Sequence, residues 1–379
     1  MRVAIDYRPA LRERSGVGEY THQLVKAMLA AFPPGRSDGE LQLSIFSSSW
    51  KDRLAASAEL AGARAIDRRI PVRLLNFAWH RWEWPPVEWL ARERFDVTHS
   101  LHPLLMPSTQ AAQVVTIHDL NFLSHPERTS AEVRRDYPAL ARVHANRADR
   151  VIVVSAFTRG EVERLLGVPG DRIAVCPPGT PGWTARQQAP KQGYILFFGT
   201  LEPRKNVGGL LDAYERVIAR EGTPEGVELV LAGKATDSAR PWLDRMARPP
   251  LQGRVRHIGY VEADQRQALY EGARLLVQPS FEEGFGLPVL EAMSLGVPVV
   301  AARRGSLPEL VGDAGALVDP EDPDEIATAI ERVLADDHYA AACAAKGIAR
   351  ARDFSWERTA HLVVDVYRQA IDRHARRRH

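Results

Sequence analysis

Cysteine is scarce in this sequence, and long apolar runs are missing. The 379 residues contain two cysteines, Cys176 and Cys343, which lie far apart and match no metal-binding or redox spacing. This excludes a disulfide framework and fits a reducing compartment. No apolar run approaches the ~20 residues of a membrane-spanning helix, and the opening MRVAIDYRP enters a strand without a charged leader and apolar core. We therefore expect a cytoplasmic protein that is at most peripheral at the inner face of the membrane.

An excess of one charge is also missing. Lys+Arg number 50 against Asp+Glu 48, for a formal net charge of +2, and the two signs are interspersed. Without a global basic field, nucleic acid is not an expected partner. The one basic run, HARRRH at the carboxyl end, is interpreted as a solvated terminus, with contact to anionic lipid as the alternative. With 45% hydrophobic and 26% charged residues, the chain is globular and long enough for two domains.

Short apolar stretches alternate with helical patterns in two series. The strand candidates are RVAID, LQLSIF, DVTHS, QVVTIH, RVIVVS and RIAVCP, and then YILFFG, VELVLAG, RVRHIG, RLLVQPS, PVVAA and GALVD. This predicts an α/β fold with two doubly wound, Rossmann-like domains. We expect domains at 1–182 and 183–355, divided by the break at 177–183, and a last helix at 356–379. Because open sheets bind ligands at the carboxyl ends of their strands, the interdomain cleft is the expected site.

The segment SFEEGFGLPVLEAMSLGVPVV, residues 280–300, places a glycine turn between two carboxylates. A strand precedes it, Pro288 suits a first helical turn, and Gly296 ends that helix. The amino end of a helix attracts an anion such as phosphate, whereas Glu283 and Glu291 would repel one. Carboxylates accept hydrogen bonds from neutral hydroxyls. The segment therefore predicts a ligand that combines a phosphate with sugar hydroxyls.

Two cations occupy the same place after another strand. In YILFFGTLEPRKNVGGLLDAYERV, Arg204 and Lys205 lie between strand and helix, and lysine is otherwise rare, with 6 among the 50 basic residues. Arginine grips phosphate oxygens with a planar fork and lysine supplies a point charge, so the pair suits a diphosphate. The alternative is a solvated helix start. Cations at the amino end of a helix are unfavourable without an anion, which favours the phosphate interpretation.

The first strand is followed by Gly16-Val17-Gly18, which superficially resembles a dinucleotide fingerprint. The third glycine is missing, and the second strand ends in serines instead of the acid that holds a ribose. Backbone N–H groups at this turn can approach a phosphate from the other domain, and an ordinary tight turn is the alternative.

His118 and Asp119 follow the strand QVVTIH, where they would face the cleft. A buried histidine with satisfied hydrogen bonds is the alternative. His99 and His102 lie upstream, but no recognised metal spacing accompanies them, so no metal site is expected. The acids of DPEDPDEIA are interpreted as a turn and a helix cap at Asp322.

Half of the 8 tryptophans fall within residues 71–90, namely Trp79, Trp82, Trp84 and Trp89. The spacing of the first two is helical, and packing in a core or between domains is the favoured interpretation. A platform for an acceptor is the second. Because Arg73 and Arg81 lie nearby, contact with a membrane interface is the third.

Two of these segments together resemble a known family. SFEEGFGLPVLEAM and GTLEPRKN are similar to the donor site of retaining glycosyltransferase family 4, whose members have the GT-B fold. IDYRPALRERSGVGEY, VVTIHDL, VIVVSAFTR, HIGYV and FSWE extend the similarity over nearly the whole chain. The resemblance implies that a nucleotide sugar binds mainly to the C-terminal domain and an acceptor to the N-terminal domain. It also implies that the last helix crosses back to the first domain.

The resemblance implies roles for individual residues. Glu283 would contact hydroxyls of the donor sugar, Glu291 would hold the ribose, and His118 would lie near the transferred sugar. Arg204 and Lys205 would bind the diphosphate. The other donor-binding positions would be Gly16 and Gly18, Gly199 and Thr200, Val261 beside the base, and Gly284, Phe285, Gly286 and Leu287. Many relatives have arginine where this chain has threonine after Gly199, which leaves Arg204 with more of the phosphate contact.

The resemblance also implies the chemistry. Departure of a nucleoside diphosphate leaves negative charge on the phosphate, which Arg204, Lys205 and helix amides would stabilise, so neither a metal nor a cofactor is required. We expect retention by front-face attack, in which the leaving phosphate takes the acceptor proton. Glu283 as a nucleophile is the weaker alternative.

The segments GTLEPRKN and IDYRP resemble those of bacterial O-antigen mannosyltransferases. The hypothesis is therefore transfer of a hexosyl group, mannose from GDP-mannose, to a glycan or lipid-linked acceptor. A UDP-sugar donor carrying a glucosyl or N-acetylglucosaminyl group is the alternative within the same fold. A noncatalytic sugar-nucleotide sensor and a sugar-nucleotide epimerase are the alternatives from other classes.

Overall fold

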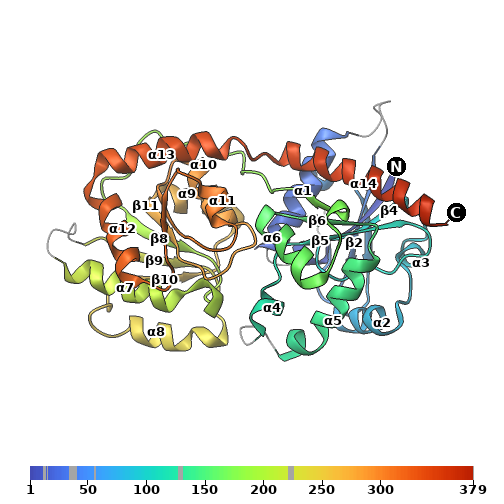
Figure 1. The fold of residues 1–379 in the computed structure, drawn as a ribbon, viewed down its shortest axis with the longest axis horizontal. Helices are drawn as coiled ribbons and strands as arrows, with labels where there is room; N and C mark the ends of the chain where they lie inside the picture. The colour runs from blue at the N-terminus through green and yellow to red at the C-terminus, as the bar shows by residue number, and fades with distance from the viewer. Residues whose placement is uncertain are drawn as a thin grey trace. The chain divides into compact units, whose positions relative to one another are not determined.

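The computed structural model describes residues 1–11, 14, 16–33, 41–54, 57–126, 131–220 and 226–378, with the backbone alone at 131–136. These residues form two compact units (Figure 1). Unit 1 comprises Met1–Gly179 and Ser355–His379, and unit 2 comprises Thr180–Phe354. Unit 2 is therefore a single insertion in the sequence of unit 1.

Unit 1 contains a parallel sheet with seven strands over its described residues, in the order β3-β2-β1-β4-β5-β6-β7. The strands are β1 (Arg2–Asp6), β2 (Gln42–Ser48), β3 (Arg64–Arg68), β4 (Val97–Ser100), β5 (Ala112–Ile117), β6 (Arg150–Val153) and β7 (Ile173–Val175). The α-helices are α1 (Val17–Ala31), α2 (Val72–Trp82), α3 (Val87–Ala91), α4 (Asn121–Ser124), α5 (Ala131–Arg147), α6 (Ala156–Glu161) and α14 (Trp356–Arg378). Shorter helical turns are η1 (Arg8–Ala10), η2 (Ala58–Leu60), η4 (Val162–Leu166) and η5 (Gly170–Arg172).

Unit 2 contains a second parallel sheet, with six strands in the described chain and the order β10-β9-β8-β11-β12-β13. The strands are β8 (Tyr194–Phe198), β9 (Leu229–Ala232), β10 (Val255–Gly259), β11 (Ala273–Gln278), β12 (Val299–Ala302) and β13 (Ala316–Val318). The helices are η6 (Pro203–Lys205), α7 (Val207–Ala219), η7 (Asp237–Ala239), α8 (Arg240–Met246), α9 (Ala263–Glu271), α10 (Leu287–Ser294), α11 (Leu307–Val311), α12 (Pro323–Ala335) and α13 (Asp337–Ala351). The predicted α/β fold with two parallel, Rossmann-like sheets is confirmed.

The burial of the strands explains why most of them could be predicted. Strands β4, β9 and β12 are buried at every residue, as expected for parallel sheets covered on both faces. The strand that was missed is β3, where Ile66 is the one buried side chain. An edge strand of this composition, with one buried apolar side chain, has no apolar run from which it could be predicted.

The last helix, α14, belongs to unit 1, where it packs on α1, β5 and β6. Its buried stripe includes Val363, Val364 and Tyr367. The phenol of Tyr367 lies 2.7 Å from Nδ1 of His99, which links α14 to β4. Within the described ranges, no helix combines the length and the apolar character needed to cross a bilayer.

The tryptophans of residues 71–90 divide into two kinds. Trp79 is buried in the core of unit 1, and its indole N–H donates to the carbonyl of Pro85 over 2.9 Å. Trp82, Trp84 and Trp89 are exposed to 64%, 55% and 63%. The predicted core role is therefore confirmed for Trp79. Within unit 1 it is wrong for the other three, because more than half of each side chain is exposed to solvent.

Candidate functional site

Two segments that are distant in sequence meet at the carboxyl edge of the unit 2 sheet. Strands β8 and β11 are neighbouring parallel strands, with Leu196 opposite Leu276. After β8 the chain forms η6, and after β11 it enters the loop that precedes α10. The backbone N–H of Phe281 donates to the carbonyl of Arg204 over 2.8 Å and joins the two segments. The predicted cations and the first predicted carboxylate are thereby brought to one edge of one sheet.

A buried ion pair lies at the centre of this edge. Nζ of Lys205 is 2.5 Å from Oε1 of Glu283, and both side chains are more than nine-tenths buried. The same oxygen accepts hydrogen bonds from Gln278 Nε2 at 3.0 Å and from Ser280 Oγ at 2.8 Å. Oε2 of the carboxylate lies 3.7 Å from Nη1 of Arg204. We name these five residues the Glu283 cluster.

The charges of the Glu283 cluster shift one another's pKa values. Burial alone would raise the pKa of Glu283, but Lys205, Arg204 and the hydrogen bonds hold it below its usual range. Burial and Arg204 lower the pKa of Lys205, and Glu283 opposes that shift. Glu283 is therefore ionised at neutral pH, where its oxygens only accept hydrogen bonds.

Arg204 is the accessible cation of the cluster, with 24% of its side chain exposed against 8% for Lys205. Its Nε lies 2.6 Å from Oε1 of Glu202. Asn206, the residue after Lys205, has a left-handed backbone with φ of 55°. Its side chain accepts a hydrogen bond from the N–H of Gly209 and so caps α7. The alternative of a solvated helix start is wrong for Lys205, because the turn directs that side chain into the interior.

The glycine turn leads directly into α10, as predicted. Gly286 precedes the helix with φ of 101°, a left-handed conformation that favours glycine, and Pro288 lies in the first turn beside Leu287. No side chain caps this amino end. The partial positive charge at the amino end of a helix can therefore attract an anion here.

Two further contacts fix the turn beside Glu283. Gly305 passes so close that a Cβ on it would lie 2.8 Å from the carbonyl oxygen of Glu283. Phe285, which follows Gly284, is buried against Phe354, with ring centroids 5.6 Å apart. The carboxylate is thus held by its backbone as well as by its hydrogen bonds.

The second predicted carboxylate, Glu291, lies on α10 and has a partner that sequence analysis missed. The phenol of Tyr270 donates to Oε2 of Glu291 over 2.7 Å, and both side chains are buried. The Tyr270 ring stacks on Phe198 with centroids 5.5 Å apart and packs at 5.9 Å from Trp183. Burial and the Glu291 carboxylate raise the pKa of Tyr270. The phenol therefore remains a hydrogen-bond donor, and no spacing rule could have linked it to Glu291.

The other predicted residues of unit 2 lie at strand ends. Gly199 follows β8, and a Cβ on it would contact the aliphatic part of Lys205 at 3.8 Å. Thr200, the next residue, is half-buried. Val261 follows β10 and is buried. All three positions therefore lie at the carboxyl edge of the unit 2 sheet, where Arg204 and Lys205 also lie.

Three predicted residues lie in unit 1. Gly16 precedes α1 with φ of 51°, and Gly18 is buried in its first turn. His118 follows β5, and its ring meets the edge of Tyr20 at 4.7 Å. Tyr20 in turn packs on Trp356 of α14 at 5.4 Å. Sequence analysis missed this aromatic series, because its members come from both ends of the chain.

The electronic state of His118 follows from burial. Burial, more than any neighbouring charge, lowers its pKa from 6.5 to about 4, so the imidazole is neutral at pH 7. Its ring is hydrogen-bonded to the backbone of Leu101. Among the residues that the structure describes, none is within hydrogen-bonding distance of the buried Nε2. Over the described residues, the hydrogen bonds of a fully satisfied core histidine are therefore incomplete.

The remaining acids and histidines of interest have structural partners. His99 lies 2.7 Å from both Tyr367 and Thr116, and His102 lies 3.0 Å from Asp6. In the described part of the chain, no group of three or more His, Cys, Asp or Glu side chains is arranged to hold a metal ion. Asp322 caps α12 by accepting from two backbone N–H groups, which confirms its predicted role.

Comparisons with known proteins agree with this architecture. Residues 14–181 match the model of "Glycosyltransferase Family 4", and residues 192–336 match that of "Glycosyl transferases group 1". The chain is 33% identical over 393 aligned residues to O-antigen chain mannosyltransferase B of Escherichia coli, covering 97% of this chain and 100% of that protein. It is 34% identical to D-inositol 3-phosphate glycosyltransferase 2 of Catenulispora acidiphila, covering 77% and 70%.

Solved structures show the same fold at lower sequence identity. Sucrose-phosphate synthase from Thermosynechococcus elongatus superposes with a TM-score of 0.77 at 22% identity, covering 97% of this chain and 98% of that one. Anabaena HepE in complex with UDP and glucose superposes with a TM-score of 0.68 at 20% identity, covering 96% and 98%. The full-length match in sequence, together with the two parallel sheets, shows that the chain is a glycosyltransferase of the GT-B type and belongs to glycosyltransferase family 4.

Proposed function

We propose that this glycosyltransferase moves a mannosyl group from GDP-mannose to a glycan or lipid-linked acceptor, with retention of configuration and without a metal. The donor assignment is supported by relatives whose names specify mannosyl transfer, O-antigen chain mannosyltransferase B and serotype-specific mannosyltransferase WbdA, both from Escherichia coli. The second relative is 30% identical over 68% of this chain, which spans 33% of that longer protein.

The observation that carries the catalytic proposal is the buried pair of Lys205 and Glu283 with Arg204 beside it. When the glycosidic bond to the diphosphate breaks, negative charge develops on the leaving oxygen. A cation that is already desolvated interacts with such charge far more strongly than one in water, and it needs no reorganisation. Lys205 and Arg204 would supply this stabilisation, and the partial positive charge at the amino end of α10 would add to it.

The two carboxylates would position the neutral parts of the donor. Glu283 is ionised and held by Lys205, Gln278 and Ser280, so a sugar hydroxyl can donate to its remaining lone pairs. Glu291, oriented by Tyr270, would accept hydrogen bonds from the ribose. The neutral His118, with Nε2 unpartnered among described residues, would accept from or orient a hydroxyl of the transferred sugar.

Retention is proposed by front-face attack. In this route the acceptor oxygen approaches on the side from which the diphosphate leaves, and a phosphate oxygen takes the acceptor proton. Glu283 is poorly suited to be a covalent nucleophile, because Lys205, Gln278 and Ser280 already bind the oxygen Oε1. The cations supply the charge that a metal ion would otherwise provide.

A UDP-sugar donor is the second candidate. The observation that favours it is the similarity in fold to Anabaena HepE, whose structure contains UDP and glucose. The two candidates differ in the base, and the contacts of the base involve residues near Val261, for which the sequence gives no diagnostic pattern.

One experiment tests donor, mechanism and metal together. The purified full chain is titrated with GDP and UDP, and then incubated with GDP-mannose or UDP-glucose, with and without a mannose-terminated acceptor and with excess EDTA. We expect tighter binding of GDP, acceptor-dependent consumption of GDP-mannose in EDTA, and an α-linked product by NMR. Binding of UDP alone would overturn the mannose assignment. Donor consumption without an acceptor would indicate an epimerase, and binding without any turnover would indicate a sensor.

A further inference from the structure

Exposed large apolar side chains are concentrated in one segment of unit 1. Among the described residues, eight such side chains are exposed, and six of them lie between residues 72 and 89. We name these six the aromatic surface: Val72, Leu74, Phe77, Trp82, Trp84 and Trp89. The aromatic members are each more than half exposed. Exposed large apolar side chains that are concentrated in one short segment are typical of an interaction site.

The aromatic surface is organised and not a scatter of single residues. On α2, Leu75 and Trp79 face the core, whereas Phe77 and Trp82, the last residue of the helix, are exposed. The rings of Phe77 and Trp82 meet edge to face at 5.3 Å. The rings of Trp84 and Trp89 meet in the same way at 6.3 Å. Two pairs of rings are thus held in place while they remain in solvent.

Exposed arginines lie close in sequence to the aromatic surface. Within the segment or next to it, the exposed ones are Arg69, Arg73, Arg81, Arg92 and Arg94. The acids of the segment are already engaged, because Glu83 pairs with Arg147, Glu93 pairs with Arg64, and Glu88 is buried. The local excess of charge is therefore positive.

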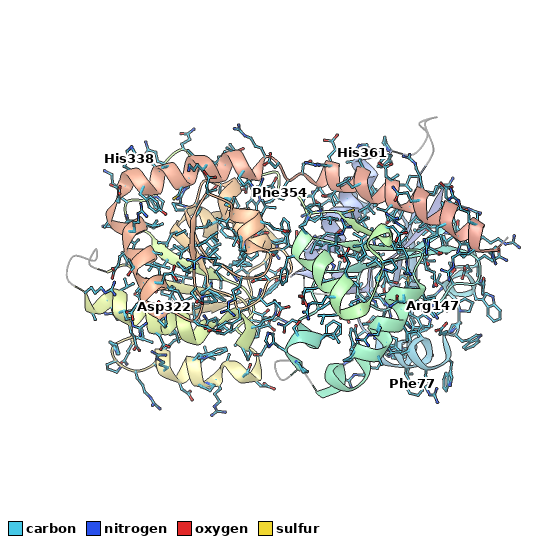
Figure 2. The ribbon with its side chains drawn as sticks, viewed as in Figure 1. Phe77, Arg147, Asp322, His338, Phe354 and His361 are labelled. Carbon is cyan, nitrogen blue, oxygen red and sulfur yellow. The ribbon has the colours of Figure 1, made fainter. Side chains whose placement is uncertain are left out.

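The basic carboxyl end of α14 lies on the same side of unit 1. Arg377 donates to the carbonyl of Arg147 over 3.3 Å, and Arg147 pairs with Glu83, between Trp82 and Trp84. Arg378 donates to the carbonyl of Thr109 over 3.5 Å, and the N–H of Thr109 donates to Glu88, next to Trp89. Figure 1 shows the end of α14 close to α3, and Figure 2 shows Arg147 and Phe77 on this flank.

We propose that the aromatic surface and the arginines around it dock unit 1 on an anionic phospholipid bilayer. Tryptophan suits the boundary between headgroups and acyl chains, since its ring is apolar and its N–H is polar. Arginine binds lipid phosphates, and its neighbours here add attraction to a negatively charged surface. A second copy of the chain fits less well, because a symmetric contact would bring the arginines of both copies together. This inference concerns a partner of unit 1 and goes beyond the proposed reaction.

The test is co-sedimentation of the full chain with vesicles. The vesicles are pure phosphatidylcholine, or phosphatidylcholine with roughly one-third phosphatidylglycerol. We expect binding to the anionic vesicles that weakens as salt is raised, and little binding to the neutral ones. The variant Trp82→Ser/Trp84→Ser/Trp89→Ser should lose about tenfold or more of this partitioning, because three rings no longer enter the interface. Trp50→Ser is the matched control, since Trp50 is 68% exposed outside the aromatic surface.

A charge variant separates lipid docking from other uses of the surface. Arg73→Glu/Arg81→Glu keeps all the rings, and it should also reduce binding to anionic vesicles about tenfold. Thermal unfolding and nucleotide binding confirm that each variant is folded, and neither readout depends on turnover. Equal vesicle binding by wild type and both variants would overturn the proposal. So would absence of wild-type binding, or dimerisation by analytical ultracentrifugation that the tryptophan variant abolishes.

Discussion

Lys205 and Glu283 are 78 residues apart in sequence, and their charged atoms lie 2.5 Å apart in a buried site. Removing one partner of such a pair leaves the other charge buried and uncompensated, which is more costly than losing the contact itself. The pair therefore links the stability of unit 2 to the chemistry proposed for it. It also makes Lys205 the most informative residue to change.

We expect Lys205→Ala to reduce turnover by roughly 100- to 1,000-fold, the usual cost of removing one preorganised charge that stabilises a transition state. The measurement is the steady-state rate with the preferred nucleotide sugar. Lys191→Ala, at an exposed lysine of the same unit, should retain normal turnover. Circular dichroism checks that the fold survives. Wild-type turnover in Lys205→Ala would refute the assigned role.

Tyr270→Phe should weaken donor binding while leaving chemistry nearly unchanged. The substitution keeps the ring stacked on Phe198 and removes the Tyr270 hydroxyl, which donates to Glu291. Loss of such a bond is worth about 1 kcal/mol, so KM for the donor should rise roughly threefold to tenfold with kcat little altered. A fall in kcat with unchanged KM would show that Tyr270 does not act by orienting Glu291.

Gly305→Ala should impair unit 2 more than a matched change at Gly312. Both glycines have positive φ, 63° and 55°, so alanine is strained at each. At Gly305 the new methyl would also lie 2.8 Å from the carbonyl oxygen of Glu283, whereas at Gly312 nothing lies within 4 Å. We therefore expect the unfolding midpoint in urea to fall further for Gly305→Ala than for Gly312→Ala, and turnover to fall for Gly305→Ala alone. If the two substitutions changed the unfolding midpoint and turnover equally, the structure would accommodate the methyl group at Gly305 without further loss of stability.

Unit 1 should lose stability as the pH falls from about 6.5 toward about 4. Burial lowers the pKa of His99 to about 3 and those of His118 and His144 to about 4, from 6.5 in each case. These groups stay neutral in the folded state while the unfolded chain takes up protons below pH 6.5, so acid favours unfolding. The free energy of unfolding, measured with urea at several pH values, should therefore decrease over this range.

A single variant separates the contribution of a buried histidine to the pH dependence of stability from the contribution of the carboxylates. His99→Gln can keep hydrogen bonds to Thr116 and Tyr367 and removes one titrating group. Its free energy of unfolding should depend less steeply on pH than that of the wild type. Parallel curves for the two proteins would show that His99 does not contribute.

Much of the fold could be predicted because its signals are local. A parallel strand buried on both faces is an apolar run, and Pro288, Gly296 and Asp322 mark helix ends through their own backbone or side-chain chemistry. Strand β3 has no such run and was missed. The exposure of Trp82 could not be predicted either, because its spacing from Trp79 is that of one helix face, and spacing does not show that α2 ends at Trp82.

The site could be predicted in its members but not in their contacts. Each motif indicates its ligand separately: Arg204 and Lys205 indicate a phosphate, and Glu283 indicates sugar hydroxyls. Their direct pairing depends on β8 and β11 being neighbours in the sheet, although β9 and β10 lie between them in sequence. The same applies to Tyr270, which reaches Glu291 from a helix on the other side of β11 in sequence. Contacts that depend on the order of the strands in a sheet cannot be predicted from the spacing of residues in the sequence.

Unit 2 is one continuous stretch of the chain, whereas unit 1 includes α14, which follows unit 2 in sequence. Translation of unit 2 is therefore complete before that of unit 1. Residues 180–354 form their compact unit without any other segment of the chain, so all of that unit is present before α14 is translated. The surface of α1 and β5 on which α14 packs is not covered until residues of α14 such as Val363 and Tyr367 are present. The unit whose translation begins first is therefore the unit that is completed last.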